Sequence, residues 1–402
     1  MPNRELKNLK PKILVLCDYY LPGYKSGGGM RTIANMVECF HDIYDFWIIT
    51  RDHDGKLERQ PYRNVKINEW NNVHYGKVFY LSRDKIKISK LHELILQVKP
   101  NIVYFNSFFA TLTIYCLILQ RLKLIPNINT ILAPCGELSV GGLSLKSIKK
   151  KVFISFAKIS KIYRNVIWKA SSKLEKNEIK RTLSNGEKIF IAADIPPKTI
   201  LSDFDLSSKP RKVSGKARLI FLSRFVRKKN FKFLIENMDK IKGDLLIDVW
   251  GPLEDLQYWE ECSKIIKKLP LNIKVEAKGA IPYEQVTNKL LEYHFFVLPT
   301  LGENFGYVFL EALAAGCPLL ISDQTPWMNL EEKGIGWEIS LDKTEKWQEI
   351  LNTIISLDTD SYNKLSHKSR RFAETWLADG SIINDTKKVL DYALENTLIK
   401  TI

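Results

Sequence analysis

Two carboxylates are the clearest candidates for chemistry in this chain. Glu303 and Glu311 are separated by seven residues within Pro299–Gly316, where a strand-like run is followed by a helix-like one. We expect the helix to open near Phe305–Gly306, so that its free N–H groups and positive dipole end could bind phosphate. Glu303 would lie just ahead of the helix and Glu311 about two turns along it, nearly on one face. Such a pair could bind different hydroxyl groups of one ligand; alternatively, Glu303 only complements the helix dipole and Glu311 only faces solvent.

A basic loop is the second candidate. Arg224, Arg227, Lys228 and Lys229 follow the strand-like run Leu219–Ser223. Fixed cations of this kind can stabilise the negative charge that develops on a departing phosphate group. A loop of this composition can equally be a solvated basic patch.

A glycine triplet is the third candidate for a functional site. Gly27, Gly28 and Gly29 precede Arg31 in the loop expected after the first strand, and a helix is expected at Met30–Phe40. Glycine lets the backbone approach a ligand closely and adopt positive φ. The triplet lacks the G-x-G-x-x-G spacing of a dinucleotide site, so a flexible turn explains it equally well.

The pattern of the whole sequence predicts a fold that could position these segments. Strand-like runs alternate with helical periodicity almost throughout, which indicates an α/β fold with parallel sheets. The periodicity breaks at Asp194–Lys216, and 402 residues suit two domains. We therefore expect two Rossmann-like doubly wound domains facing a cleft, at residues 1–200 and 201–375, with a C-terminal helix in 376–402 packing back on the first. The expected strands are Ile13–Cys17, Phe46–Ile49, Val78–Leu81, Ile102–Phe105, Thr130–Ala133 and Lys188–Ala192, then Leu219–Ser223, Leu245–Trp250, Ile273–Ala277, Phe295–Pro299 and Pro318–Ser322.

Composition narrows the class of protein. The chain is 45% hydrophobic and 26% charged, as in globular proteins, and 61 Lys+Arg against 45 Asp+Glu give a net charge of +16. This charge predicts attraction to polyanions or anionic surfaces. The six cysteines form no C-x-x-C pair, which indicates a reduced, cytoplasmic chain without a zinc site. Ile13–Cys17 is too short for a signal peptide's apolar region, and Phe108–Leu119 is shorter than the about 20 residues of a membrane-spanning helix, so we expect a buried helix there.

The segment around Glu303 resembles the E-x₇-E motif of the retaining GT-B glycosyltransferases of family 4, the group-1 sugar transferases. The similarity runs from Leu298 to Trp327 and includes Ala314–Pro318. It implies a GT-B enzyme that transfers a sugar from a nucleotide-diphosphate sugar to a glycan or lipid-linked glycan, as in cell-surface polysaccharide or O-antigen synthesis. It also implies that Glu303 contacts the transferred sugar and Glu311 the nucleotide ribose.

The same resemblance assigns further residues. Arg224 and Lys229 match the basic pair that family members direct at the donor diphosphate. Gly27–Gly29 resembles the glycine-rich first loop, which faces diphosphate and acceptor, and Ala133–Ser139 resembles an acceptor-side loop of polysaccharide-assembling members. The other residues assigned in this way are Asn304, Phe305, Gly306 and Gly251 for donor binding, and Gly136 and Glu137 for the acceptor side.

Two departures from the family pattern stand out. Many members carry a histidine after the strand that corresponds to Ile102–Phe105, whereas this chain reads Asn106-Ser107-Phe108-Phe109. The usual Asn-Gly turn before the linker is replaced by Ala192-Ala193-Asp194. The first departure removes a histidine contact with the sugar, and neither affects the donor segments.

The resemblance implies a mechanism without cofactor or metal. No side-chain base is evident in the motifs, so the leaving phosphate would take the acceptor's proton. The Asp-x-Asp spacing of a metal-binding type in Asp52-His53-Asp54 falls in a charged loop away from the donor segments. The alternatives are a GT-B epimerase and a non-catalytic protein that binds a polyanion or a membrane. No nucleic-acid-binding motif is present, so nucleic acid is not expected as a partner.

One basic stretch leaves two readings open. Lysines and an arginine lie largely apart from an apolar stripe between Ile148 and Ile167. Such a helix could lie on an anionic membrane surface at the cytoplasmic face, or it could pack its stripe on the N-terminal sheet. The stripe is Ile148, Val152, Phe153, Phe156, Ile159, Tyr163 and Ile167, and the basic residues are Lys149, Lys150, Lys158, Lys161 and Arg164.

Overall fold

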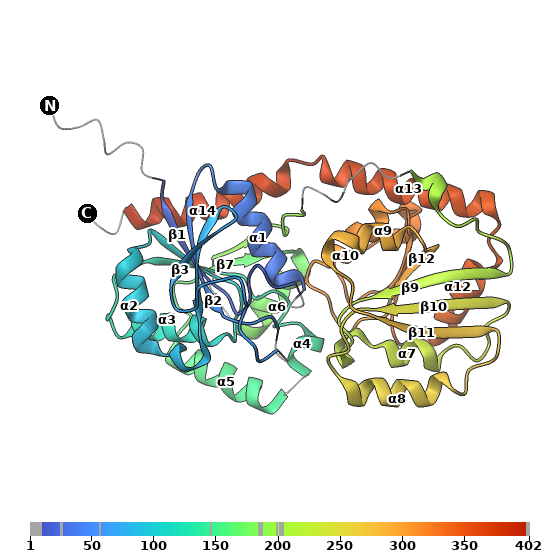
Figure 1. The fold of residues 1–402 in the computed structure, drawn as a ribbon, viewed down its shortest axis with the longest axis horizontal. Coiled ribbons are helices and arrows are strands. Elements are labelled where there is room, and N and C mark those ends of the chain that lie inside the picture. The colour runs from blue at the N-terminus through green and yellow to red at the C-terminus, as the bar shows by residue number, and fades with distance from the viewer. Residues whose placement is uncertain are drawn as a thin grey trace. The chain divides into compact units, whose positions relative to one another are not determined.

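The structure is a computed structural model that describes residues 10–24, 27–55, 58–144, 147–183, 188–197, 200 and 205–398. The chain divides into two compact units, Met1–Ile195 with Ser381–Ile402, and Pro196–Gly380. Each unit contains a largely parallel sheet covered by helices (Figure 1). The α/β class predicted from the alternation of strand-like and helix-like runs is confirmed. The units divide at Ile195 and Gly380, against the expected 200 and 375.

The first unit is built on an eight-stranded sheet in the order β3-β4-β2-β1-β5-β6-β7-β8. All neighbouring strands are parallel except β3 and β4. The chain reverses its direction across the sheet between β1 and β5, which makes this the switch point where such sheets bind ligands. The strands are β1 (Lys12–Leu16), β2 (Asp45–Arg51), β3 (Trp70–Val73), β4 (Gly76–Leu81), β5 (Ile102–Phe105), β6 (Asn129–Leu132), β7 (Ile167–Ala170) and β8 (Lys188–Ile191).

Helices cover this sheet and bury its central strands. Every residue of β5 and β6 is buried, as expected for parallel strands with helices on both faces. The C-terminal helix α14 packs against β5 and β6 of this unit, where Asn129 Nδ2 donates to the Ala393 carbonyl at 2.8 Å. The helices are α1 (Gly28–Phe40), α2 (Ile88–Val98), α3 (Thr111–Arg121), α4 (Val140–Ser144), α5 (Ser147–Ser160), α6 (Lys173–Leu183) and α14 (Ser381–Leu398).

Two expectations for this unit were wrong. Strands β3 and β7 were not anticipated, and the amphipathic stretch 148–167 is not one helix. Helix α5 ends at Ser160, because Lys161 and Asn165 adopt left-handed φ values of 51° and 74°, and Ile167 belongs to β7. The part of this stretch that is helical therefore carries only the first five apolar positions of the expected stripe.

The second unit contains a fully parallel six-stranded sheet in the order β11-β10-β9-β12-β13-β14. Its switch point lies between β9 and β12. Helices α7 and α8 contact each other along one side of the sheet, and α10 contacts α9 and α13 along the other (Figure 1). The strands are β9 (Lys216–Leu222), β10 (Asp244–Trp250), β11 (Ile273–Gly279), β12 (Phe295–Leu298), β13 (Leu319–Ser322) and β14 (Gly336–Ile339), of which only β14 was not expected. The helices are α7 (Phe231–Glu236), α8 (Leu256–Ile266), α9 (Val286–Leu290), α10 (Tyr307–Ala314), α11 (Leu330–Lys333), α12 (Thr344–Ser356) and α13 (Thr359–Leu377).

Side chains define several of these helix ends. Asp255 and Asp358 cap α8 and α13 by accepting the N–H groups of Tyr258 and Ser361. Lys209 donates to the Ala315 carbonyl at the C-terminal end of α10, where a cation also complements the helix dipole. Over the described ranges, none of the helices has the length and apolar character needed to cross a membrane.

Candidate active site

The acidic and basic candidates of the second unit meet at the switch point of its sheet. Arg224 and Lys229 lie in the loop that follows β9, and Glu303 lies in the loop that follows β12. Because β9 and β12 are neighbours, their carboxyl ends bring these two loops together. Segments more than seventy residues apart in the sequence therefore form one surface at the position where parallel sheets bind ligands.

Lys229 and Glu303 form an ion pair at this surface. The Lys229 ammonium donates to Glu303 Oε2, and both side chains are largely buried. Burial acts to raise the pKa of the Glu303 carboxyl, but the charges of Lys229 and then Lys228 outweigh it and hold the pKa below its ordinary value. Glu303 is thus an ionised carboxylate with a cation in direct contact.

Hydrogen bonds from the backbone fix the two loops against each other. The Leu301 N–H donates to the Lys228 carbonyl at 2.8 Å, and the Thr300 hydroxyl donates to the same oxygen at 3.2 Å. The Glu303 N–H donates to the Gln324 carbonyl in the loop after β13, at 3.0 Å. Glu303 is therefore held by its own backbone as well as by its ion pair.

Helix α10 begins at Tyr307, close to the expected start, with Gly306 as its N-cap. Gly306 has a φ of 78°, and a Cβ there would lie 2.6 Å from the Phe309 ring. Glu303 precedes this left-handed residue and lies just ahead of the helix, as expected. Between them, Asn304 and Phe305 form the approach to the helix, and the Phe305 carbonyl accepts the Trp327 indole N–H at 2.6 Å.

Glu311 lies in the middle of α10 and is buried. This excludes the alternative that it is a solvated helix residue. Gly251, after β10, approaches the loop after β9 so closely that a Cβ would lie 1.9 Å from the Ser223 carbonyl oxygen, and its φ is 130°. Only glycine fits this position, so Gly251 shapes the basic loop whatever else it contacts.

The four basic residues of the loop are not equivalent. Arg227 is matched by two carboxylates, Glu261 at 2.6 Å and Asp255 at 3.3 Å. Arg224 contacts Glu254 at 3.2 Å and is partly exposed, whereas Lys229 is directed at Glu303. The loop is therefore not a uniform solvated patch.

In the first unit, the glycine segment lies at the other switch point. Gly27 is the N-cap of α1 with a φ of 74°, and Gly28 and Gly29 form the first turn of that helix. The expectation that all three glycines lie in a loop was wrong for Gly28 and Gly29. The segment nevertheless follows β1 and places the N-terminal end of α1 at the carboxyl edge of the sheet.

Asn106 occupies the loop position where related proteins were expected to carry histidine. Its Nδ2 donates to the Gly29 carbonyl at 2.7 Å, and its Oδ1 accepts the Cys135 thiol at 3.1 Å. It thereby joins the segments that follow β1, β5 and β6. This role was not predicted, because the contacts depend on the order of the strands.

The Glu137 carboxylate is partly buried and bonded within the protein. Its Oε2 accepts the N–H groups of Phe108 at 2.7 Å and Phe109 at 3.1 Å, and Ser107 Oγ donates to both of its oxygens. Burial raises the pKa of Glu137, although these hydrogen bonds act to lower it. The adjacent Gly136, with a φ of 73°, donates its N–H to Glu175 at 2.7 Å. Glu137 thus holds the loop that carries Asn106.

Two further polar pairs were missed. Asp52 and His53 lie in the charged loop expected after β2, where they are buried and hydrogen-bonded to each other at 2.8 Å. Lys169 pairs with Asp194 at 2.8 Å, also buried. Lys169 lies inside the apolar run Ile167–Ala170, and a buried charge needs a partner of opposite sign. The sequence could therefore have indicated a buried acidic residue nearby. In the described residues, no group of three or more His, Cys, Asp or Glu side chains is placed to hold a metal ion.

Comparisons with known proteins agree with this geometry. Residues 203–374 match the family model described as glycosyl transferases group 1. No curated protein sequence matches the chain.

Solved structures resemble the chain over almost its whole length. A sucrose-phosphate synthase from Thermosynechococcus elongatus has a TM-score of 0.70 at 15% identity, with 96% of this chain and 100% of that one covered. HepE from Anabaena, in complex with UDP-glucose, has a TM-score of 0.67 at 16% identity, covering 95% and 98%. WaaG, a glycosyltransferase involved in lipopolysaccharide biosynthesis, has a TM-score of 0.66 at 11% identity, covering 94% and 98%. The fold is GT-B, and residues 203–374 of this chain match the family model of the group-1 glycosyl transferases.

Proposed function

We propose that this chain transfers a sugar from a nucleoside-diphosphate sugar to a hydroxyl group of a glycan or lipid-linked glycan in cell-surface polysaccharide synthesis. The observation that carries the proposal is the Lys229–Glu303 pair at the switch point of the second sheet. A cation for the diphosphate and an ionised carboxylate for the sugar hydroxyls are there in direct contact. HepE, a structure of the same fold, is in complex with UDP-glucose, so UDP-glucose is the first donor to test.

The proposed reaction retains the configuration of the sugar. The bond between the anomeric carbon and the diphosphate oxygen breaks as the acceptor oxygen bonds to that carbon from the same face. The acceptor's proton passes to the leaving phosphate oxygen. Lys229, Arg224 and the N-terminal end of α10 stabilise the charge that develops on the diphosphate. Glu303 orients the sugar, and Glu311 binds the ribose.

The test is stabilisation of the purified chain by a panel of nucleotide sugars, followed by transfer or hydrolysis assays with any that bind. A bound donor at 100 times its Kd should stabilise the folded state by about 2.7 kcal/mol. The Lys229→Ala variant should lose this stabilisation, whereas Arg227→Ala should keep it. If no nucleotide protects the chain and DNA does so in a salt-dependent way, the chain is a polyanion-binding protein instead.

We further propose that the transfer needs no metal ion, because Lys229 and Arg224 supply the fixed positive charge. Activity should persist in EDTA, and added Mg²⁺ or Mn²⁺ should leave it unchanged. Loss of activity in EDTA with recovery on adding either ion would contradict the proposal that Lys229 and Arg224 replace a metal ion.

A further inference from the structure

Helix α5 carries an apolar face that the protein does not cover. Ile148, Val152, Phe156 and Ile159 are between 59% and 83% exposed. On the same helix, Phe153, Ile154 and Ala157 pack against the core of the first unit. One apolar face of α5 therefore anchors the helix to the core, and the exposed residues form a second apolar face.

The exposed face is bordered by lysines on both sides. At 100° per residue, the four exposed apolar side chains span an arc of roughly 80°. Exposed Lys149 lies at one margin of this arc, and exposed Lys151 and Lys158 lie beyond the other. Lys150 lies on the side of the helix that faces the core and donates to the Gly142 carbonyl at 2.5 Å. We call Ile148, Val152, Phe156 and Ile159 with Lys149, Lys151 and Lys158 the α5 face.

The sequence on both sides of α5 is basic. From Leu138 to Leu174 the sequence contains no Asp or Glu, and it contains nine Lys or Arg. The segment that carries the α5 face is therefore basic, like the chain as a whole, whose net charge is +16.

We propose that the α5 face docks on the surface of a bilayer that contains anionic lipids. A helix that lies in the membrane interface buries an apolar face at the boundary of headgroups and acyl chains and keeps its basic residues among the phosphates. The arrangement of α5 meets both requirements. A second copy of this chain is disfavoured as the occupant, because a symmetric contact would bring lysine margins against lysine margins.

The experiment is co-sedimentation of the full-length chain with vesicles of phosphatidylcholine alone and of phosphatidylcholine with about one third phosphatidylglycerol. The chain should bind the anionic vesicles, bind the neutral ones at least tenfold more weakly, and dissociate as salt rises. Phe156→Ser with Ile159→Ser should weaken binding at least tenfold. Lys149→Gln with Lys158→Gln should weaken it by about fivefold for each charge removed.

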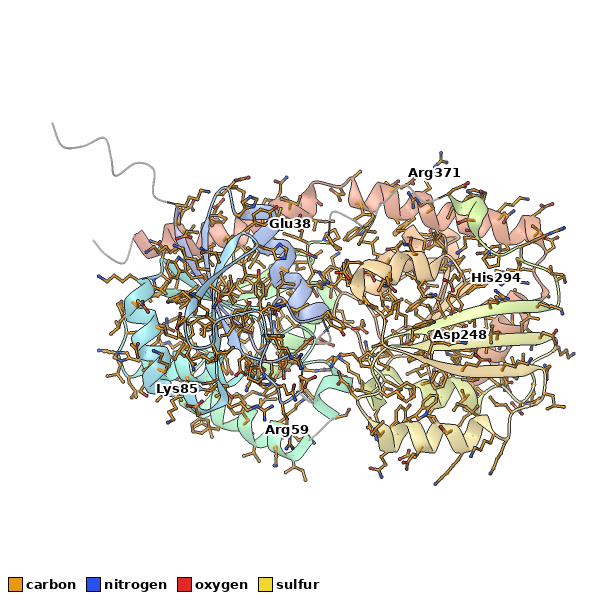
Figure 2. The ribbon with its side chains drawn as sticks, viewed as in Figure 1. Glu38, Arg59, Lys85, Asp248, His294 and Arg371 are labelled. Atoms are coloured by element: carbon orange, nitrogen blue, oxygen red, sulfur yellow. The ribbon has the colours of Figure 1, made fainter. Side chains whose placement is uncertain are left out.

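Matched controls separate the α5 face from general charge and hydrophobicity. Leu122→Ser removes an exposed apolar residue at the end of α3, and Lys85→Gln with Lys87→Gln removes two exposed charges (Figure 2 labels Lys85). Both control variants should bind anionic vesicles like the parent chain. All variants should keep the thermal unfolding temperature and the donor binding of the parent. Donor binding tests the proposed function and vesicle sedimentation tests the α5 face, so failure of one can be told apart from failure of the other.

Three outcomes would overturn the proposal. The parent chain fails to bind anionic vesicles, the α5 variants bind as well as the controls, or sedimentation without vesicles shows an oligomer that the α5 variants abolish. The last result would assign the α5 face to a second copy of the chain.

Discussion

The Lys229 ammonium donates directly to the Glu303 carboxylate, across the switch point between β9 and β12. A donor diphosphate at this position would meet a cation that a neighbouring carboxylate already orients. Two fixed cations facing a developing dianion should each contribute on the order of 2–4 kcal/mol to the transition state. Lys229→Ala should therefore lower kcat/KM for the donor by roughly thirtyfold to a thousandfold, measured in a steady-state transfer assay.

The same loop supplies the control for that prediction. Arg227 is engaged by Glu261 and Asp255, so its charge is balanced within the protein, and Arg227→Ala should change kcat/KM little. Lys228 is a less clean control, because its charge also acts on the pKa of Glu303. Equal losses for Arg227→Ala and Lys229→Ala would mean that the loop acts through its general charge.

Glu303→Ala should lower kcat at least about a hundredfold, because it removes a contact with the reacting sugar that strengthens in the transition state. The fold should persist, since the backbone of Glu303 remains bonded to Gln324. The measurement is kcat on purified variant with its unfolding temperature as control. A purified Glu303→Ala protein with near-normal turnover would refute the assignment.

Glu311→Ala should mainly raise the KM for the donor, as expected when a ribose contact is lost. The structure makes this a demanding test, because Glu311 is buried in α10. A structural role predicts the opposite pattern, with an unchanged KM and a lower unfolding temperature. Titration of the variant with the nucleoside diphosphate alone separates the two, because the diphosphate retains the ribose and lacks the sugar.

Glu137→Ala should destabilise the first unit by roughly 1–3 kcal/mol, because the partly buried N–H groups of Phe108 and Phe109 lose their acceptor. Denaturant unfolding of the parent and the variant measures this change. Glu137→Gln is the matched variant, since its amide oxygen can still accept these N–H groups, and it should cost less. If Glu137 instead binds the acceptor directly, both variants should raise the acceptor KM without loss of stability.

Local sequence was sufficient for most of the elements and for the positions of the loops that carry Lys229 and Glu303. The apolar runs of β5 and β12 and the glycine before α10 are properties of adjacent residues, and their bounds fall within a residue or two of those expected. Strand β7 was missed because its Ile167 continued an apolar helical period, and only the left-handed residues at positions 161 and 165 break it. Tertiary packing sets backbone turns of this kind, and the spacing of apolar residues along the sequence does not indicate them.

The contacts between loops required the strand order. Asn106 bonds to Gly29 because β5 lies next to β1, and no feature near either residue indicates this. The Lys229–Glu303 contact depends in the same way on β9 lying next to β12. The sequence could place both residues in loops that follow strands, but it could not show that they touch.

A buried histidine gives the second unit a dependence on pH that is separate from the site. His294, which Figure 2 labels, accepts the Arg218 N–H at Nδ1 at 3.0 Å, and its Nε2 faces the Pro210 carbonyl at 3.2 Å, so the neutral ring satisfies both partners. Burial, together with the charges of Lys212 and Lys209, lowers the pKa of His294 to about 4. A proton on Nδ1 would also break the bond from Arg218.

The sign of the effect follows from proton uptake. Between about pH 6.5 and pH 4 the unfolded chain binds a proton at His294 and the folded chain does not, so stability falls as pH decreases through this window. The loss at the lower end should be roughly 2–3 kcal/mol. His294→Gln, whose amide oxygen can accept the Arg218 N–H, should flatten the dependence of the denaturation midpoint on pH. The exposed His367 on α13 is the matched control, and His367→Gln should leave the slope unchanged. Equal slopes for the parent and His294→Gln would show that other groups cause the acid sensitivity of this unit.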